Sequence, residues 1–368
     1  MSSSRLFKPL KVGDVQLKHR ISMAPLTRFR ADENHVPLPM VAEYYAQRAS
    51  VPGTLLISEA TLISHQAGGY PNVPGIYTKE QIESWKKVTE AVHEKGSFIY
   101  LQLWALGRVA DPAQAEKEGI TIKTSSPVSL GEGFATPKEM TVEEIKLTIG
   151  DYVQAAKNAI EAGFDGVELH GANGYLIDQF NQDKVNQRTD EWGGSVENRS
   201  RFVYESTKAV AEAIGAKKTS VRLSPYSSFQ GMRMDDPIPQ FKDIVKKLDS
   251  LNDLAYIHLV ESRLDGNVED DDSPADKLEP FVDQFRNTVL IAGGLGPNSA
   301  PRVVDKQYPN KDVIVVFGRY FISTPDLVFR LEKGIELNPY DRDTFYSPMK
   351  AEGYLDYPFS KEFLSAQA

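Results

Sequence analysis

The sequence predicts a parallel (β/α)8 barrel of the TIM-barrel class, an α/β fold in a single domain spanning residues 1–368. Eight short runs rich in β-branched residues recur along the chain, and amphipathic helical stretches lie between them. Strands that alternate with helices in this way are typical of parallel sheets. No G-x-G-x-x-G sequence follows the first run, which counts against a doubly wound dinucleotide-binding sheet. No linker and no internal repeat divides the chain, so we expect one domain.

Composition excludes several classes of function. Apolar residues make up 41% of the 368 residues and charged residues 25%, which is ordinary for a soluble globular protein. The net charge of -9 and the pI near 5.3 argue against nucleic acid or an anionic membrane as a partner. Disulfides and cysteine nucleophiles are excluded because there is no cysteine, and the dispersed histidines predict no metal site. No apolar run suits a signal peptide or a transmembrane helix, so we expect a cytoplasmic location.

Local patterns place the strands and the clearest helix starts. The eight predicted strands are Arg20–Ala24, Thr54–Glu59, Phe98–Leu103, Gly166–Leu169, Ser220–Leu223, Ala255–Val260, Val289–Ala292 and Val313–Phe317. Two intervening helices begin with capping-box sequences, Thr78 with Gln81 and Thr141 with Glu144. The second opens a helical apolar stripe that should stop at Gly163.

Three further segments carry weaker signals. Thr324-Pro325-Asp326 is typical of a helix start with proline in the first turn. Glu269-Asp270-Asp271-Asp272 lacks the glycine and the distal glutamate of a calcium loop, so we expect a solvated loop. The stretch Ala110–Lys138 shows no clear period, and we expect it to cross the barrel mouth between the third strand and its helix.

The stretch Asp165–Tyr175 is the strongest candidate for a functional site. It begins as a buried strand and then breaks at two glycines, where His170, Asn173 and Tyr175 follow within six positions. His170 and Asn173 can both donate hydrogen bonds without carrying a full charge, which suits an oxygen that becomes negative during reaction. Tyr175 offers a phenolic proton. The alternative is a histidine satisfied by backbone and an asparagine chosen for its tolerance of unusual dihedrals.

Two other strand ends suggest a phosphate site. Gly293-Gly294 follows the seventh predicted strand, and Gly318-Arg319 follows the eighth. Glycines allow backbone N–H groups to approach an anion, and an arginine can pair with it bidentately. Loops after these two strands commonly hold phosphate in such barrels. The alternative is a tight turn and a surface ion pair.

A flat heteroaromatic ring attached to that phosphate would lie across the mouth. Gln102 offers a donor and an acceptor for an amide-like ring edge, and Thr27 could bond a ring carbonyl. Arg222 would place a positive charge beside a ring that becomes anionic on reduction. Alternatively, Arg222 could bridge Glu168 inside the barrel, and Gln102 and Thr27 could satisfy neighbouring backbone.

Several longer motifs resemble the Old Yellow Enzymes, a family of flavin-dependent ene-reductases. The likeness extends from Leu6-Phe7-Lys8-Pro9-Leu10 to Gly353-Tyr354-Leu355-Asp356-Tyr357-Pro358. Its most specific parts are Met23–Arg28, His170–Phe180, Asp190–Arg199 and Phe317–Leu327. The segments Arg48–Leu56 and Gly353–Phe359 are similar to the fungal branch that acts in ergot-alkaloid pathways.

The resemblance implies FMN as the prosthetic group and NADPH as the co-substrate. The residues it implies at the flavin ring and ribityl chain are Pro25, Thr27, Ala60, Gln102 and Arg222. Those it implies at the phosphate are Gly293, Gly294, Gly318 and Arg319. Ala60 stands where some members have glycine, which changes backbone freedom under the flavin but not the chemistry. The loop from Glu261 to Asp276 departs from the yeast pattern, which leaves pocket shape and substrate preference open.

The resemblance also implies the substrate site and the reaction. His170 and Asn173 are expected to bind the carbonyl oxygen of a small α,β-unsaturated compound, and Tyr175 to protonate its α-carbon. The aromatic residues implied in the pocket wall are Trp104, Tyr70 and Tyr346. Two alternatives remain: a flavin-dependent isomerase or reductase of a fungal secondary-metabolite pathway, and a flavin-free barrel lyase. We expect a monomer or a homodimer.

Overall fold

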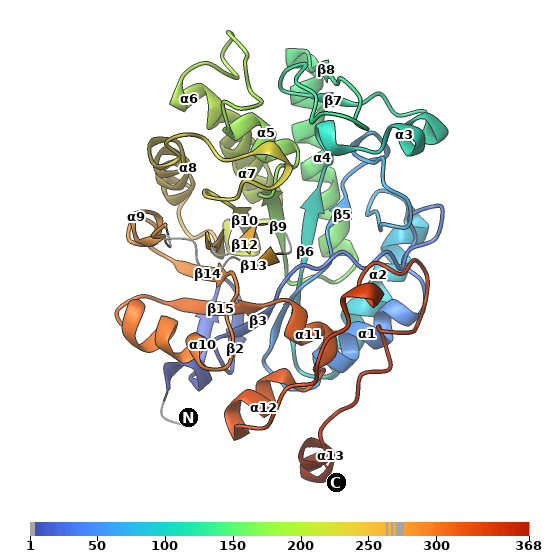
Figure 1. Ribbon diagram of the computed structural model, residues 1–368, viewed down its shortest axis with the longest axis vertical. Helices are drawn as coiled ribbons and strands as arrows, with labels where there is room; N and C mark the ends of the chain where they lie inside the picture. Colours follow the sequence, from blue (N-terminus) through green and yellow to red (C-terminus); the bar gives the residue numbers. More distant parts are fainter. Residues whose placement is uncertain (1–3, 263, 266–267, 270–275, 368) are drawn as a thin grey trace.

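Eight parallel strands form a closed barrel at the centre of the computed structural model, which describes residues 4–262, 264–265, 268–269 and 276–367 (Figure 1). The strands are β3 (Ile21–Met23), β4 (Leu55–Ile57), β6 (Phe98–Trp104), β9 (Gly166–Gly171), β10 (Thr219–Leu223), β11 (Tyr256–Val260), β14 (Thr288–Ala292) and β15 (Val313–Phe317). Their order is β4-β3-β15-β14-β11-β10-β9-β6, and a parallel pairing of β4 with β6 closes the ring. The predicted (β/α)8 fold is confirmed, and each strand lies within two residues of its predicted bounds.

Helices cover the outside of the barrel. They are α1 (Met40–Arg48), α2 (Lys79–Glu94), α4 (Val142–Glu161), α7 (Arg201–Ile214), α8 (Ile238–Ser250), α9 (Glu279–Val282), α10 (Ser299–Arg302), α11 (Arg319–Ser323) and α12 (Leu327–Lys333). The last helix, α13 (Lys361–Gln367), packs against α12 through the rings of Phe363 and Phe329. Trp85, Tyr152 and Phe202 are fully buried on three of the covering helices and pack in one core with the outward-facing strand residues. Because the strands are buried on both faces, some of them, such as β15, are continuous apolar runs.

The helix-start predictions had mixed outcomes. Thr78 with Gln81, and Thr141 with Glu144, form complete capping boxes at α2 and α4. The helix predicted to start at Thr324-Pro325-Asp326 is present as α12, which begins at Leu327 with Asp326 at its N-cap, but the proline precedes the first turn instead of lying in it. The Asp326 carboxylate does not cap this helix, because it binds Arg330 and Ser360 instead.

A small antiparallel hairpin covers the amino-terminal end of the barrel. It consists of β1 (Leu10–Val12) and β2 (Val15–Leu17). Its apolar side chains form a core with Tyr100, Tyr256 and Ile314 from inside the barrel. Side chains therefore fill this end of the barrel, and the opposite mouth is the one that opens into a large cavity.

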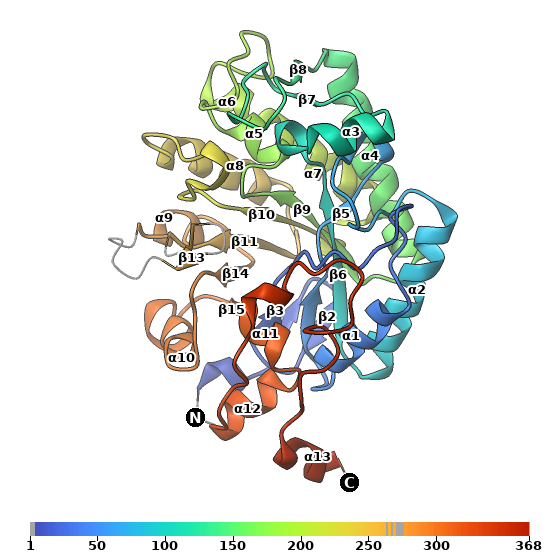
Figure 2. The same ribbon diagram turned by 45° about the vertical axis from the view of Figure 1, so that its right-hand side comes forward.

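The connection between β6 and α4 contains structure that the sequence did not predict. Earlier in the chain, a two-residue strand, β5 (Thr61–Leu62), pairs in parallel with the end of β6. The stretch Ala110–Lys138 holds α3 (Pro112–Glu118) and most of a short pair, β7 (Lys123–Thr124) with β8 (Lys138–Glu139). The helix α3 and the pair β7–β8 lie at the same end of the molecule as α5 (Leu176–Asn181) and α6 (Val196–Arg199), as both ribbon views show (Figure 2).

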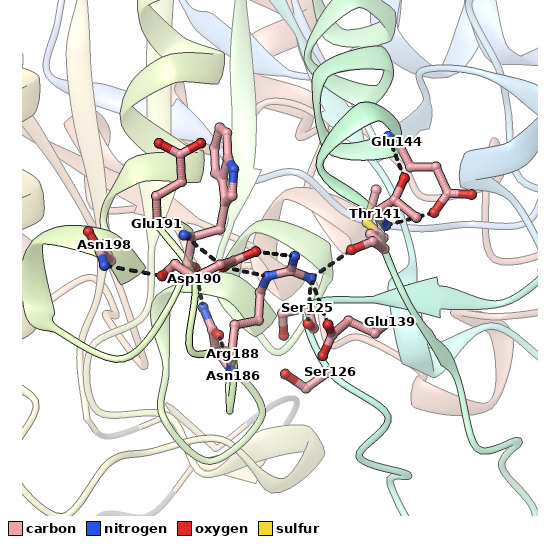
Figure 3. A network of polar contacts seen from close by, with 12 residues as sticks. Ser125, Ser126, Glu139, Thr141, Glu144, Asn186, Arg188, Asp190, Glu191 and Asn198 are labelled. Carbon is pink, nitrogen blue, oxygen red and sulfur yellow. Dashed lines mark hydrogen bonds and ion pairs between the residues drawn. The ribbon is translucent and has the colours of Figure 1, made fainter.

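One arginine links this connection to the motif around Asp190. The Arg188 guanidinium donates to the carbonyl oxygens of Ser125 and Met140, at 3.1 and 2.7 Å, and pairs with the Asp190 carboxylate at 2.6 Å (Figure 3). Asn186 donates to the carbonyl oxygen of Trp192 at 2.8 Å. The motif Asp190–Arg199 thus has a structural place beside the mouth rather than in it.

The first residue of the acidic run lies in a short hairpin. Glu269, expected in a loop, ends β13 (Val268–Glu269), which pairs with β12 (Leu264–Asp265). The loop prediction is wrong for that residue, because strand pairing extends through it. Asp270-Asp271-Asp272 lies outside the described residues. Among the helices that the structure describes, none is long and apolar enough to span a membrane.

Candidate active site

The segment after β9 is held on both sides by backbone hydrogen bonds. The amide of Asn173 donates to Ser224 Oγ at 2.7 Å, and the amide of Gly174 donates to Asp178 Oδ2 at 2.9 Å. Asn173 and Gly174 have φ values of 57° and 77°, a left-handed conformation that asparagine and glycine adopt most readily. A Cβ on Gly174 would also lie 2.8 Å from the Cβ of Gln230. The sequence therefore fixes the turn that presents Asn173 and Tyr175.

These side chains face a cavity of about 550 Å³ at the carboxyl ends of the barrel strands. Its lining includes twelve of the predicted site residues: Pro25, Thr27, Ala60, Tyr70, Gln102, Trp104, His170, Asn173, Tyr175, Arg222, Arg319 and Tyr346. They come from segments that are far apart in the sequence. Barrel closure brings them together, as expected for strand ends that share one mouth.

A second hollow of about 150 Å³ adjoins the cavity and contains the predicted phosphate glycines. Gly293, Gly294 and Gly318 line it together with Arg319, and both Arg319 and Arg222 also line the large cavity. Gly293 has a φ of 138°, and a Cβ there would lie 2.8 Å from the Cβ of Glu261. Only glycine fits this position, where the backbone lines a hollow next to a cationic side chain.

Aromatic rings form one wall of the large cavity. The Tyr175 ring lies 5.0 Å from that of Trp104, edge to face, and 4.9 Å from the imidazole of His170. Tyr70 packs edge-on against Trp104 at 5.8 Å. On another side, Tyr346 packs edge-on against Phe29 at 5.8 Å. The space between these walls suits a flat, largely apolar molecule.

Burial keeps the two candidate proton-bearing groups neutral. It lowers the pKa of His170 well below its ordinary value, and the positive charge of Arg222 lowers it further. Burial likewise raises the pKa of Tyr175, and the Tyr70 phenol nearby adds to this effect. At neutral pH the imidazole is thus an uncharged donor, and the phenol keeps its proton.

A buried glutamate lies beneath the cavity. The Glu168 carboxylate accepts hydrogen bonds from Gln102 Nε2 at 2.7 Å and from His258 Nδ1 at 2.9 Å. Burial alone would raise the pKa of Glu168, but His258, Arg222 and Gln102 together lower it. The structure differs from the alternatives given for Gln102 and Arg222. Gln102 bonds a carboxylate rather than backbone, and the hydrogen-bonded partner of Glu168 on its other side is His258 rather than Arg222.

Comparisons with known proteins agree with this arrangement. The profile of the NADH:flavin oxidoreductase / NADH oxidase family matches residues 5–338. The crystal structure of Old Yellow Enzyme from Pichia sp. AKU4542 superposes with a TM-score of 0.90 at 40% identity, covering 98% of this chain and 94% of that one. The Old Yellow Enzyme homologue of Zymomonas mobilis gives 0.89 at 37% identity, covering 96% and 99%. The chain belongs to the Old Yellow Enzyme family.

Curated fungal relatives are more similar still. A chanoclavine-I aldehyde reductase of Penicillium roqueforti is 54% identical, over 99% of this chain and 98% of the relative. An NADP-dependent oxidoreductase of Aspergillus flavus is 53% identical, over 98% and 97%. A protein of Epichloe festucae var. lolii, 52% identical over 99% and 98%, is described as a probable inactive reductase.

The site fits the flavin that the Old Yellow Enzyme family implies. His170 Nδ1 and Arg222 Nε are buried and have no hydrogen-bond partner among the described residues. Buried polar atoms are normally paired, so these two indicate a ligand atom beside them. The glycine-lined hollow with Arg319 provides a place for an anionic group at one end of the cavity. The residues present are therefore those that a phosphorylated, ring-bearing cofactor needs.

Sequence reasoning missed several residues of this Old Yellow Enzyme site. Phe29, Phe229, Ile322 and Phe345 line the cavity, and Glu168 contacts its floor through Gln102. Phe29 and Phe345 lie in irregular segments and Phe229 begins a single 3-10 turn, so none of them has a periodic signal. The signal available for Glu168 was its charge in the middle of an otherwise apolar strand.

Proposed function

We propose that this protein is an FMN-dependent ene-reductase that uses NADPH to reduce the C=C bond of α,β-unsaturated carbonyl compounds. The observation that carries this proposal is the grouping of neutral His170, Asn173 and protonated Tyr175 on one cavity. Two uncharged donors beside a proton-bearing phenol suit a substrate whose oxygen gains negative charge while a neighbouring carbon takes up a proton.

In this proposal His170 and Asn173 bind the carbonyl oxygen of the substrate. Because His170 is uncharged, its ring can donate a hydrogen bond without first losing or gaining a proton. Its position is fixed by β9, where it pairs in register with Arg222 of β10. Asn173 is fixed by the left-handed turn that Ser224 and Asp178 hold. Donors fixed in advance in a water-poor site stabilise developing charge most effectively.

Tyr175 is proposed to deliver the proton to the α-carbon. Its phenol stays protonated because burial raises its pKa. The Trp104 ring, 5.0 Å away and edge-on, limits how far the phenol can swing. A general acid needs this combination of a retained proton and a restricted position.

The cofactor would occupy the floor of the cavity. Pro25, Thr27, Ala60, Gln102 and Arg222 would hold its ring, and Gly293, Gly294, Gly318 and Arg319 its phosphate. When bound, FMN supplies the hydride acceptor and donor between NADPH and the substrate. Arg222 places a positive charge beside the ring, which favours taking up electrons there. The NADP-dependent relative in Aspergillus flavus supports the choice of NADPH.

The relatives support an unsaturated aldehyde as one class of substrate. Two of the similar proteins are named as chanoclavine-I aldehyde reductases, and the cavity is lined largely by aromatic and aliphatic side chains. A bulky, mostly apolar aldehyde or enone matches such a lining. Because other relatives are described as probable inactive proteins, the test must measure net reduction.

The purified protein provides that test. We expect it to be yellow, to lose its flavin absorbance on anaerobic addition of NADPH, and to regain the absorbance when cyclohexenone is added. Each NADPH oxidised should yield one cyclohexanone. A colourless protein that takes up no added FMN would refute the proposal, as would re-oxidation by oxygen alone with no reduced product.

A further inference from the structure

A buried chain of three polar side chains crosses the barrel beneath the cavity. Gln102 on β6 donates to Glu168 on β9, and Glu168 accepts from His258 on β11. The exposed fractions of these residues are 1%, 0% and 0%. Among them only Gln102 lines the cavity, so Glu168 and His258 could act on a bound molecule only through Gln102 or through charge.

The sheet register places this chain next to Arg222. Gln102 and Glu168 are direct partners across β6 and β9. Arg222, on β10, is in register with His170 on one side and with His258 on the other. The anionic and cationic side chains therefore occupy adjoining layers of the barrel interior, under the same part of the cavity.

The charge state of the group follows from its contacts. Burial lowers the pKa of His258, so its ring is neutral and donates from Nδ1. His258, Arg222 and Gln102 lower the pKa of Glu168 despite its burial, so it is a carboxylate. A buried charge persists only when it is paired and hydrogen-bonded. The interior thus holds one negative charge on Glu168 and one positive charge on Arg222.

We infer that Glu168, supported by His258, is a positioning residue that fixes the amide of Gln102 and offsets the charge of Arg222, and so lowers the reduction potential of the bound flavin. The inference rests on the proposed flavin site but not on the identity of the substrate. Nothing in the proposed reaction uses Glu168 or His258.

The first effect concerns the orientation of Gln102. A carboxylate can only accept hydrogen bonds, so it must face the NH2 group of the Gln102 amide. The Gln102 oxygen is then the end left for the cavity, where it can accept a hydrogen bond from a ring N–H. If Glu168 were an amide, Gln102 could turn over and present a donor to the ring instead. A donor there favours the electron-rich, reduced ring.

The second effect is electrostatic. A fixed negative charge in a poorly solvated interior opposes the addition of electrons nearby, and Arg222 favours it. With both present the two influences partly cancel. Removing only the charge of Glu168 leaves the pull of Arg222 unopposed. Both effects therefore act in the same direction.

The variant Glu168→Gln tests this in the FMN-bound protein. We expect the ratio of affinities for reduced over oxidised FMN to rise about tenfold, which corresponds to a potential about 30 mV higher for a two-electron couple. Photoreduction against a reference dye measures the potential with no enone present. The half-reactions should change in opposite directions: flavin reduction by NADPH becomes faster, and re-oxidation by cyclohexenone becomes slower. General structural damage would slow both.

A matched pair at His258 gives an independent measurement if Glu168→Gln folds poorly. His258→Asn keeps a donor near the position of Nδ1, and His258→Leu has a similar size without one. We expect His258→Asn to retain the wild-type potential and His258→Leu to raise it, because an unsupported Glu168 takes up a proton. An unchanged potential in both Glu168→Gln and His258→Leu, with FMN bound, overturns the inference and leaves the proposed function intact. A protein that binds no FMN would refute the proposed function itself.

Discussion

At the level of single residues, the site depends on burial to keep polar groups neutral. Tyr175 and His170 have rings 4.9 Å apart, yet the pKa of the phenol is raised and that of the imidazole is lowered, in both cases chiefly by burial. Over the same pH range, Tyr175 therefore keeps a proton that it can give up, and His170 is an uncharged hydrogen-bond donor. Such opposite shifts are characteristic of sites with separate acid and hydrogen-bonding roles.

Tyr175→Phe should separate the two half-reactions. We expect re-oxidation of the flavin by cyclohexenone to slow by about 100-fold or more, since a general acid contributes about 10²–10⁴ in rate. Flavin reduction by NADPH should stay near the wild-type rate, because no proton from Tyr175 is needed there. Stopped-flow absorbance resolves both steps. Tyr77→Phe, outside the cavity, should change neither step, and a Tyr175→Phe defect confined to flavin reduction would rule out the proton-donor role.

The double variant His170→Ala with Asn173→Ala tests the oxygen-binding pair. One donor to a developing oxyanion is worth about 3–4 kcal/mol at a transition state, so enone reduction should fall by well over 100-fold. FMN should remain bound, because the phosphate glycines and Arg319 are untouched. Flavin absorbance after gel filtration measures retention, and stopped-flow re-oxidation measures the rate. Near-normal turnover in this variant would eliminate the assigned role.

At the level of elements, the buried arginines Arg28, Arg30 and Arg48 hold the C-terminal segment 344–354 in place through its carbonyl oxygens. Arg28 donates to the carbonyl oxygens of Phe345 and Gly353, at 3.0 and 2.7 Å. Arg30 donates to those of Lys350 and Phe345, at 2.9 and 3.1 Å. The segment returns beside β3 and α1 (Figure 2). Phe345 and Tyr346 of this segment line the cavity. The arginines therefore determine the position of that side of the cavity.

Arg30→Met should loosen this segment without touching the flavin residues. Its guanidinium donates to several carbonyls of the segment and stacks 4.7 Å from the Tyr354 ring centroid. Loss of the buried donors should lower the free energy of unfolding by about 2–3 kcal/mol and raise the KM for bulky enones more than kcat changes. Hydrogen exchange of residues 344–354 reports the loosening. Arg286→Met, an exposed arginine paired with Asp249, is the matched control; equal exchange in both variants would contradict the expectation.

The elements also show which parts of the fold sequence patterns can predict. Strands β14 and β15 were predicted almost to the residue because a continuous β-branched run is a local property. The capping boxes at Thr78 and Thr141 are equally local. By contrast, the Asp326 side chain binds Ser360, 34 positions away, and the place of Phe345 depends on arginines over 300 positions away. No local pattern encodes such contacts, so sequence reasoning missed them.

At the level of the whole molecule, barrel closure determines which residues meet. The fifteen predicted site residues lie around two adjoining hollows because parallel strands end at one mouth. The same closure buries charged groups that a smaller fold would leave in water. Glu59, directly before Ala60 of the cavity lining, is 2% exposed. Burial raises the pKa of Glu59 to about 7, although the Arg28 backbone amide and the charges of Arg28 and Arg30 act against this.

The raised pKa of Glu59 predicts that stability falls as the pH rises through the weakly acidic range. The folded protein holds this proton up to about pH 7, whereas the unfolded chain releases it near the ordinary value of 4.5. The folded state therefore binds more protons between these limits, and the free energy of unfolding decreases with rising pH. The shift corresponds to about 3 kcal/mol between pH 4.5 and 8, at about 1.4 kcal/mol for each pH unit.

Glu59→Gln, which mimics the protonated side chain, should remove this contribution. We expect its free energy of unfolding to fall about 3 kcal/mol less than that of the wild type between pH 4.5 and 8, as measured by urea unfolding. Asp178, whose pKa is also raised to about 7 by burial, acts equally in both proteins and cancels in the comparison. Glu161→Gln, at an exposed position at the end of α4, should follow the wild-type curve. Parallel pH dependences in the wild type and Glu59→Gln would mean that Glu59 is already ionised in the folded protein, and that Arg28 and Arg30 outweigh its burial.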